Sequence, residues 1–206
     1  MAQITTGLRS VLTRPWAYKA LQAAVGAGRF RRYFVDHYVR PRVGERILDI
    51  GCGPGEIVPY LPEGVEYVGY DISPEYIEWA RRRFPGRGEF YALPFQQSEV
   101  SRHRPFDTAI VIAVLHHLDD ADARNLLALL KRAVRAGGRV ITADPVSIEG
   151  QNRIAQMMVD WDRGQNIRHC DEYAALATPI FGHVDGEIID MARIPRMLRT
   201  WVMQCS

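Results

Sequence analysis

The sequence predicts an α/β protein with a doubly wound, seven-stranded, mostly parallel sheet. Between residues 46 and 144, short apolar runs typical of buried strands alternate with helical segments. Strands that alternate with helices of this length form parallel sheets with helices on both faces. Two further strand-like runs, 183–191 and 198–205, lie close together near the end of the sequence. They predict a C-terminal antiparallel hairpin.

The first predicted element is a helix at 18–39, where apolar residues recur at near-helical spacing until Pro41 and Gly44 interrupt the pattern. The segment "RILDI" at 46–50 is then predicted as a short buried strand. We therefore expect N-terminal helices in front of the first strand.

A β-α-β unit follows. "EIVPYL" at 56–61 is predicted as the start of a helix and "EYVGYD" at 66–71 as the second strand. "SPEYIEWARRRF" at 73–84 is predicted as a helix with Ser73 as N-cap and Pro74 at its first position.

Three more strands and one helix complete the predicted sheet. The strands are expected at "GEFYA" (88–92), "FDTAIVIAV" (106–114) and "RVITAD" (139–144), with a helix at 120–134 before the last of them. The segment 145–180 is too long for a simple connection, and we expect it to form a helical insert after the fifth strand.

Net charge and cysteine usage narrow the class of protein. The formal charge is +2, and the three cysteines show neither CxxC nor Cys/His spacing. We therefore expect no nucleic-acid partner, disulfide framework or metal site, and a cytoplasmic location. The sequence has no apolar run of the roughly 18 residues that a membrane span needs. The acid-poor N-terminus leaves a transit peptide as an alternative.

The loop "GCGPGE" directly after the first strand predicts a ligand site. Gly51, Gly53 and Gly55 permit close backbone approach. Glu56 occupies the position where a dinucleotide fingerprint has its third glycine or alanine, and its charge would repel phosphates.

Two aspartates near this loop indicate the kind of ligand. Asp71 ends the second strand, a position from which a carboxylate can accept both hydrogen bonds of a ribose diol. Asp49 lies two residues before Gly51 and adds negative charge. The loop with both aspartates favours a nucleoside that carries positive charges.

The segments "ILDIGCGPG", "VGYDIS", "FDTAIVIAVLHHLDD" and "RAGGRVITADP" resemble, in order and spacing, the successive motifs of class I S-adenosylmethionine (SAM)-dependent methyltransferases. "AVLHHLDD" is similar to the segment found in the ubiquinone/menaquinone-biosynthesis branch of this family and its small-molecule relatives. The resemblance covers about residues 46–145 and implies a Rossmann-like fold, with SAM as cofactor.

The resemblance also implies roles for individual residues. Asp49 and the backbone of Gly51, Gly53 and Gly55 would bind the methionine end of SAM, Asp71 the ribose and Ile72 the adenine ring. Relatives commonly have an aspartate before "LPF", whereas this chain has Ala92 there. Backbone groups around Ala92 and Leu93, or the amide of Gln96, would substitute.

His116 and His117 follow the fourth strand, where an acceptor would meet the methyl group, so either is a candidate general base. Packing beside the cofactor loop is the alternative, and a metal site with Asp119 is a weaker one. Asp144 ends the fifth strand and would line the acceptor pocket or cap the next turn.

The helical insert supplies further candidates for acceptor binding: Trp161, Arg163, Arg168 and Tyr173. The two arginines would hold an acidic or phosphorylated acceptor through bidentate geometry, or form plain salt bridges. "RFRRYF" and "RRRF" interleave basic and aromatic residues, for which a solvated helix face is preferred over RNA binding.

These observations predict methyl transfer from SAM to an oxygen or nitrogen of a small-molecule acceptor, such as a sugar, lipid or natural-product intermediate. The alternatives are a catalytically silent methyltransferase-like binding domain and an NAD(P)-dependent oxidoreductase. We expect one domain, comprising a helical lid (1–43), a cofactor-binding core (44–144), an acceptor-site cap (145–180) and a terminal strand pair (181–206). The sequence indicates no oligomeric state.

Overall fold

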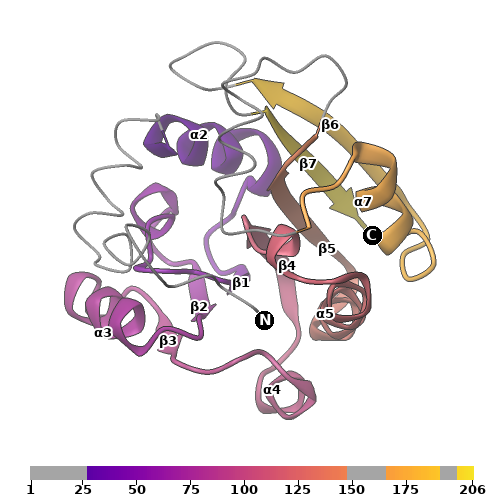
Figure 1. The fold of residues 1–206 in the computed structure, drawn as a ribbon. Coiled ribbons are helices and arrows are strands. Elements are labelled where there is room, and N and C mark those ends of the chain that lie inside the picture. The colour runs from indigo at the N-terminus through magenta and orange to yellow at the C-terminus, as the bar shows by residue number, and fades with distance from the viewer. Residues whose placement is uncertain (1–26, 148–165, 191–198) are drawn as a thin grey trace.

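The computed structural model describes residues 27–147, 166–190 and 199–206. They form a seven-stranded sheet in the order β3-β2-β1-β4-β5-β7-β6 (Figure 1). The strands are β1 (Arg46–Ile50), β2 (Glu66–Tyr70), β3 (Glu89–Tyr91), β4 (Phe106–Ile112), β5 (Val134–Pro145), β6 (Val184–Asp190) and β7 (Arg199–Cys205). The predicted fold class is confirmed.

The first five strands are parallel, and the last two are antiparallel to their neighbours. β6 and β7 form the predicted antiparallel pair, and β7 also pairs with β5, which leaves β6 at the edge. The order thus differs from the doubly wound order 3-2-1-4-5-6 by one antiparallel strand, inserted between the fifth and sixth.

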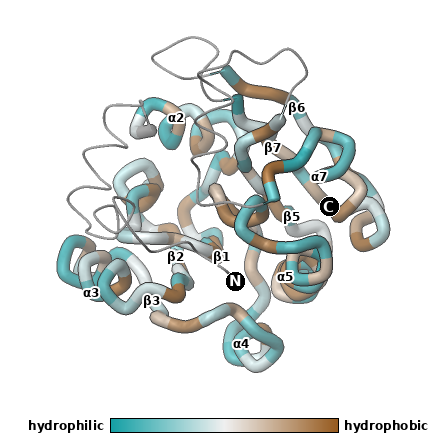
Figure 2. Tube along the Cα trace, viewed as in Figure 1, coloured by the Kyte–Doolittle hydropathy of each residue, from teal (hydrophilic) through white to brown (hydrophobic). Residues whose placement is uncertain are grey.

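Helices cover both faces of the sheet. On one face α2 (Ala27–Phe34), the π-helix η2 (Val35–Val39) and α3 (Pro74–Arg83) pack on apolar residues such as Ile47 and Ile110. On the other, α5 (Asp120–Ala133) and α7 (Cys170–Ala177) pack on residues such as Leu48 and Val111. Figure 2 shows hydrophilic residues along the outer turns of α3 and α5. The alternation of side chains along each strand therefore supplies both cores.

Helices α3 and α5 begin at side-chain caps. Ser73 Oγ accepts from the N–H of Tyr76, which confirms the predicted N-cap of α3. Asp119 Oδ1 accepts from the N–H of Asp122 at the start of α5, at 2.8 Å. Each cap satisfies a backbone donor that the first helical turn leaves without a partner.

Three local expectations need correction. The predicted helical start at 56–61 is only the short 3₁₀ helix η3 (Val58–Tyr60), because Pro59 lacks the N–H that an α-helix needs and Pro62 follows directly. β5 begins at Val134, earlier than predicted. The sequence did not predict α4 (Gln97–Arg102), a polar helix.

The outer segments are described only in part. Of the helix predicted at 18–39, residues 27–39 are described and are helical. Of the helical insert predicted at 145–180, the structure describes the helix α7, and residues 148–165 lie outside the described part. Within the described ranges, no helix has the length and apolar character needed to cross a membrane. The division into lid, core, cap and strand pair stays a prediction.

Candidate functional site

The candidate site lies where the strand order reverses, between β1 and β4. In open α/β sheets, ligands bind outside the carboxyl ends of the strands at this switch point. The glycine loop follows β1 there, and the 3₁₀ turn η4 (Leu115–His117) follows β4. The two segments touch, because a Cβ added to Gly51 would lie 2.3 Å from Cγ2 of Val114.

The glycine loop has a backbone that other residues rarely adopt. Gly51, Gly53 and Gly55 have φ of 73°, 53° and 74°, and only glycine adopts this left-handed region at little cost. The N–H groups of Gly51 and Cys52 both donate to the carbonyl of Tyr70, at 2.8 and 3.1 Å. The loop is therefore fixed to the end of β2.

Asp71 links the glycine loop to the start of α3. Its Oδ2 accepts from the N–H of Gly53 at 2.9 Å, and its Oδ1 accepts from the N–H of Ser73 at 2.8 Å. Burial raises the pKa of Asp71, and these two hydrogen bonds oppose the rise. A carboxylate offers about four acceptor positions, so each oxygen keeps capacity for a hydroxyl of a ligand.

Asp49 is buried at the end of β1, with 3% of its surface exposed. Its Oδ2 accepts a hydrogen bond from the hydroxyl of Tyr67 at 2.6 Å. Burial, with a smaller contribution from the charge of Asp71, raises the pKa of Asp49 to about 7, although the Tyr67 hydrogen bond and Arg31 act in the opposite direction. Asp49 therefore changes charge near neutral pH.

Tyr67 is a residue that the sequence did not single out. It lies on the same face of β2 as Gly69, which is paired in register with Asp49. A Cβ on Gly69 would come within 3.1 Å of the Tyr67 ring and 2.8 Å of Cys52 Sγ. The alternation of side chains along β2 places Tyr67 on this face of the sheet. Its contact with Asp49 depends in addition on the register between β1 and β2.

Glu56 forms ion pairs that the sequence did not indicate. Its Oε1 accepts from Arg83 at 2.6 Å, and its Oε2 lies 4.0 Å from Arg31. These arginines compensate the charge of Glu56, so Glu56 repels phosphates less than its charge alone would imply. Asp49 and Asp71 remain as the acidic groups beside the loop.

The residues expected at the adenine ring lie at the carboxyl ends of β2 and β3. Ile72 is 43% exposed, one of three large hydrophobic residues that are exposed in the described part of the chain. Ala92 is exposed and Leu93 is half-buried. The N–H of Asp71 donates to the carbonyl of Tyr91 at 3.1 Å, which holds the two strand ends together.

His116 and Asp144 form a buried pair, with 2% and 1% of their surfaces exposed. The ring nitrogen Nδ1 of His116 lies 2.8 Å from Asp144 Oδ1, which also accepts from the backbone N–H of His116 at 3.2 Å. An ionised carboxylate only accepts hydrogen bonds, so this partner assigns the proton to Nδ1 and leaves Nε2 as the basic nitrogen. Within the described residues, Asp144 Oδ2 has no hydrogen-bond partner.

His117 and Asp119, the other residues expected to act at this edge of the sheet, lie close to His116 in the chain. The His117 ring is half-buried, with its centroid 4.0 Å from that of His116. Asp119 caps α5 with its side chain. In the part of the chain that the structure describes, no three His, Cys, Asp or Glu side chains gather as metal ligands.

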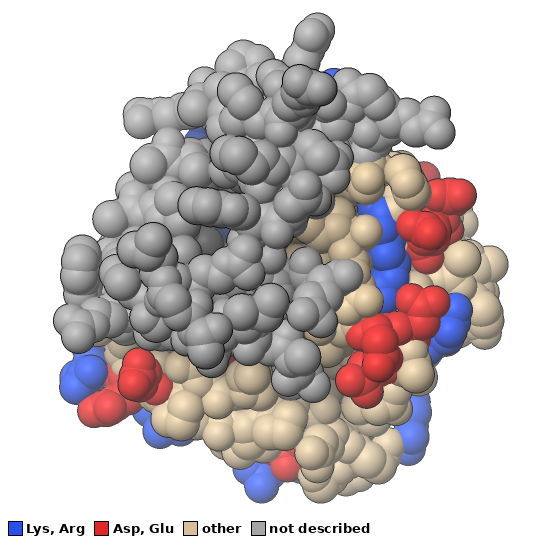
Figure 3. Space-filling model, in the orientation of Figure 1, with Lys and Arg blue, Asp and Glu red and all other residues tan. Residues whose placement is uncertain are grey.

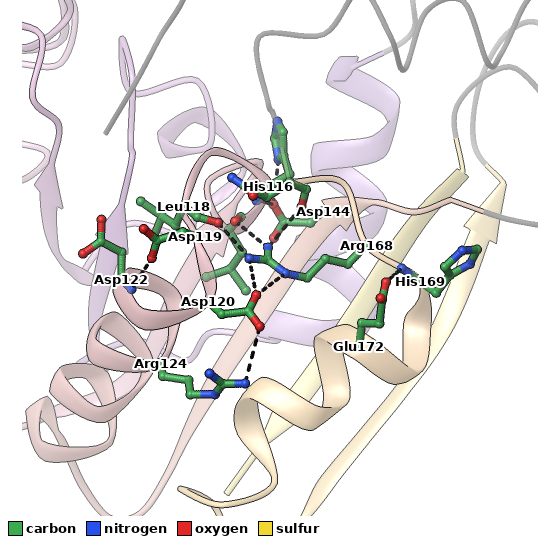
Figure 4. Close-up of polar contacts among 12 residues, drawn as sticks. His116, Leu118, Asp119, Asp120, Asp122, Arg124, Asp144, Arg168, His169 and Glu172 are labelled. Carbon is green, nitrogen blue, oxygen red and sulfur yellow. Dashed lines mark hydrogen bonds and ion pairs between the residues drawn. The ribbon is translucent and has the colours of Figure 1, made fainter.

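Of the residues expected to bind the acceptor, Trp161 and Arg163 lie outside the described residues. Tyr173 is fully buried, and its hydroxyl donates to the carbonyl of Pro145 at 3.0 Å. Arg168 is 7% exposed and directs its guanidinium into the protein, toward Asp120 and the turn that carries His116 (Figure 4). Arg168 and Tyr173 are thus engaged within the protein.

Comparisons with known proteins bear on the family and the fold of this chain. Residues 47–138 match the family model described as "Methyltransferase domain". An O-methyltransferase of Pyrenophora dematioidea is 31% identical over 118 residues, which are 54% of this chain and 43% of that protein. The chain covers 31% to 51% of the length of the first curated relatives that it matches.

Solved structures show the same fold. The magnesium protoporphyrin IX methyltransferase of Synechocystis PCC 6803, solved with bound SAM, aligns with a TM-score of 0.62 at 16% identity. That alignment covers 87% of this chain and 78% of that protein. Residues 47–138 are thus similar to a methyltransferase domain, and the chain shares the fold of these enzymes.

The methyltransferase domain match includes Asp49, the glycine loop, Asp71 and His116, and it ends before Asp144 and Arg168. The ubiquinone/menaquinone branch stays a prediction. The domain's fold is not restricted to methyltransferases, because the [4+2]-cyclase SpnF aligns with a TM-score of 0.66 at 15% identity, over 87% of this chain and 81% of that one.

Proposed function

We propose that this protein transfers the methyl group of SAM to an oxygen or nitrogen of a small-molecule acceptor. The observation that carries the proposal is Asp71, whose carboxylate accepts from the N–H of Gly53 at the carboxyl end of β2. This contact brings the expected ribose binder and the expected methionine-end binders into one site, beside the switch point of the sheet.

The acidic groups of the site favour a cationic nucleoside over a dinucleotide. Asp49 and Asp71 both lie beside the glycine loop, where they would weaken the binding of a pyrophosphate and strengthen that of an ammonium or sulfonium. Ile72 offers an exposed apolar surface for the adenine ring, next to Ala92 and Leu93. These acidic groups therefore make the alternative hypothesis, an NAD(P)-dependent oxidoreductase, less favoured.

When bound, SAM supplies a methyl group that is activated by its sulfonium. The protein has to align the acceptor with that methyl group, exclude water and, for a hydroxyl acceptor, remove a proton. In our proposal, His116 takes this proton on Nε2. Asp144 holds Nδ1–H and stabilises the imidazolium that forms, in the manner of the aspartate in a Ser-His-Asp triad.

The acceptor is proposed from the relatives. The O-methyltransferase of Pyrenophora dematioidea favours an oxygen acceptor, and a base such as His116 is useful when the acceptor is a hydroxyl. On the face shown in Figure 3, the described Lys and Arg side chains lie among Asp and Glu side chains. This mixed charge gives no support to a nucleic-acid acceptor.

Calorimetry with SAM and with its demethylated product tests the cofactor proposal. We expect micromolar or tighter binding by the wild type. Asp71→Ala removes a charged acceptor of two hydroxyl hydrogen bonds, each worth about 1.5–3 kcal/mol, so we expect a loss of affinity of about 100-fold or more. Asp36→Ala, which removes an exposed aspartate of η2, is the control and should bind as the wild type does.

Methyl transfer itself is tested with SAM labelled in its methyl group and a pool of small-molecule extracts. Transfer of label into a small molecule is expected. Tight cofactor binding without transfer of label into any acceptor would favour the catalytically silent domain. The proposal would be refuted if the wild type does not bind the cofactor and Asp71→Ala changes neither binding nor transfer.

A further inference from the structure

Arg168 lies between the end of β5 and the start of α7. Its backbone forms a parallel bridge with Val146, and its carbonyl accepts from the N–H of Ser147 at 3.1 Å. Its side chain is buried, with the guanidinium carbon 5.7 Å from the ring centroid of Tyr173 on α7. Arg168 is therefore held beside the end of β5, the strand that carries Asp144.

All five N–H donors of the Arg168 guanidinium have acceptors within the protein. Nε donates to Asp120 Oδ1 at 3.1 Å, and one terminal nitrogen donates to the same oxygen at 2.9 Å and to the carbonyl of Leu118 at 2.8 Å. The other terminal nitrogen donates to the carbonyls of Leu115 and Asn166, at 3.0 and 3.1 Å. A guanidinium has five donors, so none is left for an acidic or phosphorylated acceptor.

Two of the acceptors of Arg168 are backbone carbonyls on either side of His116 and His117 in the chain. Leu115 and Leu118 lie on either side of the histidines of η4, and both of their carbonyls point to the guanidinium. The carbonyl of His116 accepts from the N–H of Asn166 at 3.0 Å. Segment 166–168 thus binds the carbonyls of Leu115, His116 and Leu118, while Asp144 accepts from the N–H and contacts Nδ1 of His116.

We propose that Arg168 is a positioning residue, which fixes the η4 turn so that His116 keeps its Nδ1–H bond to Asp144 and presents Nε2 as the base. Its relevance to catalysis rests on the proposed methyl transfer. Figure 4 shows the guanidinium between Asp120 and the turn, next to the His116–Asp144 pair. Lysine could not replace it, because an ammonium has three donors and no planar fork.

The test uses full-length protein labelled with ¹⁵N in its histidines. In the wild type, we expect the ring nitrogen shifts of His116 to report one tautomer, with the proton on Nδ1. In Arg168→Lys and Arg168→Met we expect these shifts to move toward the average of the two tautomers. The amide protons of His116 and Asn166 should exchange about tenfold faster or more, because local opening of the turn becomes easier.

Arg124→Gln is the matched control. Arg124 also pairs with Asp120, at 3.5 Å, but its side chain is half exposed and none of its described contacts is with a carbonyl of the turn. We expect no change in the His116 shifts in this variant. The affinity for the demethylated cofactor, measured by calorimetry, should change by less than about threefold in Arg124→Gln, because none of the described contacts of Arg124 reaches the glycine loop.

The proposal would be overturned if the His116 ring shifts stay unchanged in a folded Arg168→Met or Arg168→Lys protein. This holds even if the melting temperature falls, because a residue that only stabilises the fold would lower the melting temperature and leave the His116 tautomer unchanged. If Arg168→Met does not fold, Arg168→Lys carries the test. Failure of the proposed function would be recognised separately, as absence of cofactor binding in the wild type.

Discussion

At the scale of single residues, Asp49 is the acidic group of the site whose pKa is raised to about 7. Its carboxyl is buried and its oxygen accepts from the hydroxyl of Tyr67. Removal of the carboxylate from water disfavours its ionised form, and one hydrogen bond does not compensate fully. The protein therefore holds an acidic group that is costly without a ligand and would become useful when a cation binds beside it.

Asp49→Asn should stabilise the ligand-free protein at neutral and alkaline pH. The pKa of Asp49 rises from 3.8 to about 7 on folding, so the folded state holds this proton more tightly and wild-type stability falls as pH rises from about 4 to about 7. Asparagine lacks this penalty and still accepts from Tyr67. Urea unfolding should show Asp49→Asn more stable by at most about 4 kcal/mol at pH 8, and by much less at pH 4.5. An equal difference at both pH values would contradict the pKa shift.

The affinity for SAM should rise with pH through the titration of Asp49. If the ionised carboxylate attracts the charges of the cofactor, binding below pH 7 requires loss of the Asp49 proton. Calorimetry between pH 6 and pH 8 should show the dissociation constant falling by up to about tenfold per pH unit below the pKa and levelling above it. Asp49→Asn should bind more weakly and lose this dependence.

At the scale of elements, the glycine loop shows how sequence and packing act together. Its three glycines have left-handed backbones, but they differ in the space around them. A Cβ at Gly53 would meet nothing within 4 Å, whereas at Gly51 it would overlap Val114, which follows β4. The positive φ therefore favours glycine at all three positions. At Gly51 there is a second reason, because a side chain there would overlap Val114 in the segment after β4.

Gly51→Ala should destabilise the protein more than Gly53→Ala does. Each substitution adds about 1–2 kcal/mol of backbone strain, and Gly51→Ala adds an overlap with Val114 that costs about 1–3 kcal/mol more. Chemical denaturation of both variants measures the difference. In Gly51→Ala/Val114→Ala the overlap is removed, and that variant should lose less than the sum of its single substitutions. Strict additivity would argue against the contact.

At the scale of the whole molecule, residues far apart in the chain hold the N-terminal π-helix on the sheet. Arg139 of β5 donates to the carbonyls of Tyr38 and Val39 at 3.1 and 2.8 Å. The hydroxyl of Tyr38 donates to Glu187 of the edge strand β6 at 2.8 Å. The two hydrogen bonds from Arg139 satisfy the last carbonyls of η2, which have no partner within the helix.

Arg139→Met should destabilise the whole protein by about 2–3 kcal/mol, because two hydrogen bonds to a charged group are lost and two carbonyls lose their donors. Arg135→Met is the matched control, since Arg135 is half exposed and pairs with Asp107 at the surface, where a pair contributes about 1 kcal/mol or less. Equal melting temperatures for the two variants would contradict the role given to Arg139.

The sequence by itself determined the strands, their order along the chain and most of the helices between them. Short apolar runs, helical patterns, the cap Ser73 and the glycines of the loop are local signals, because each depends on residues that are neighbours in the chain. Resemblance to a family then assigned roles to Asp49, Asp71 and the glycines. The polar helix α4 carried no periodic apolar signal and was missed.

Only the tertiary structure decided which side chains meet. His116 and Asp144 are 28 positions apart, and Arg168 reaches a carbonyl 53 positions earlier. These contacts depend on the parallel pairing of β4 with β5 and on the path of the segment before α7, as the Asp49–Tyr67 bond depends on the register of β1 and β2. Local patterns specify a strand but not its partner, because register is set by packing across the sheet. For that reason Arg168, expected to bind an acceptor, was found with all five donors bound to the protein.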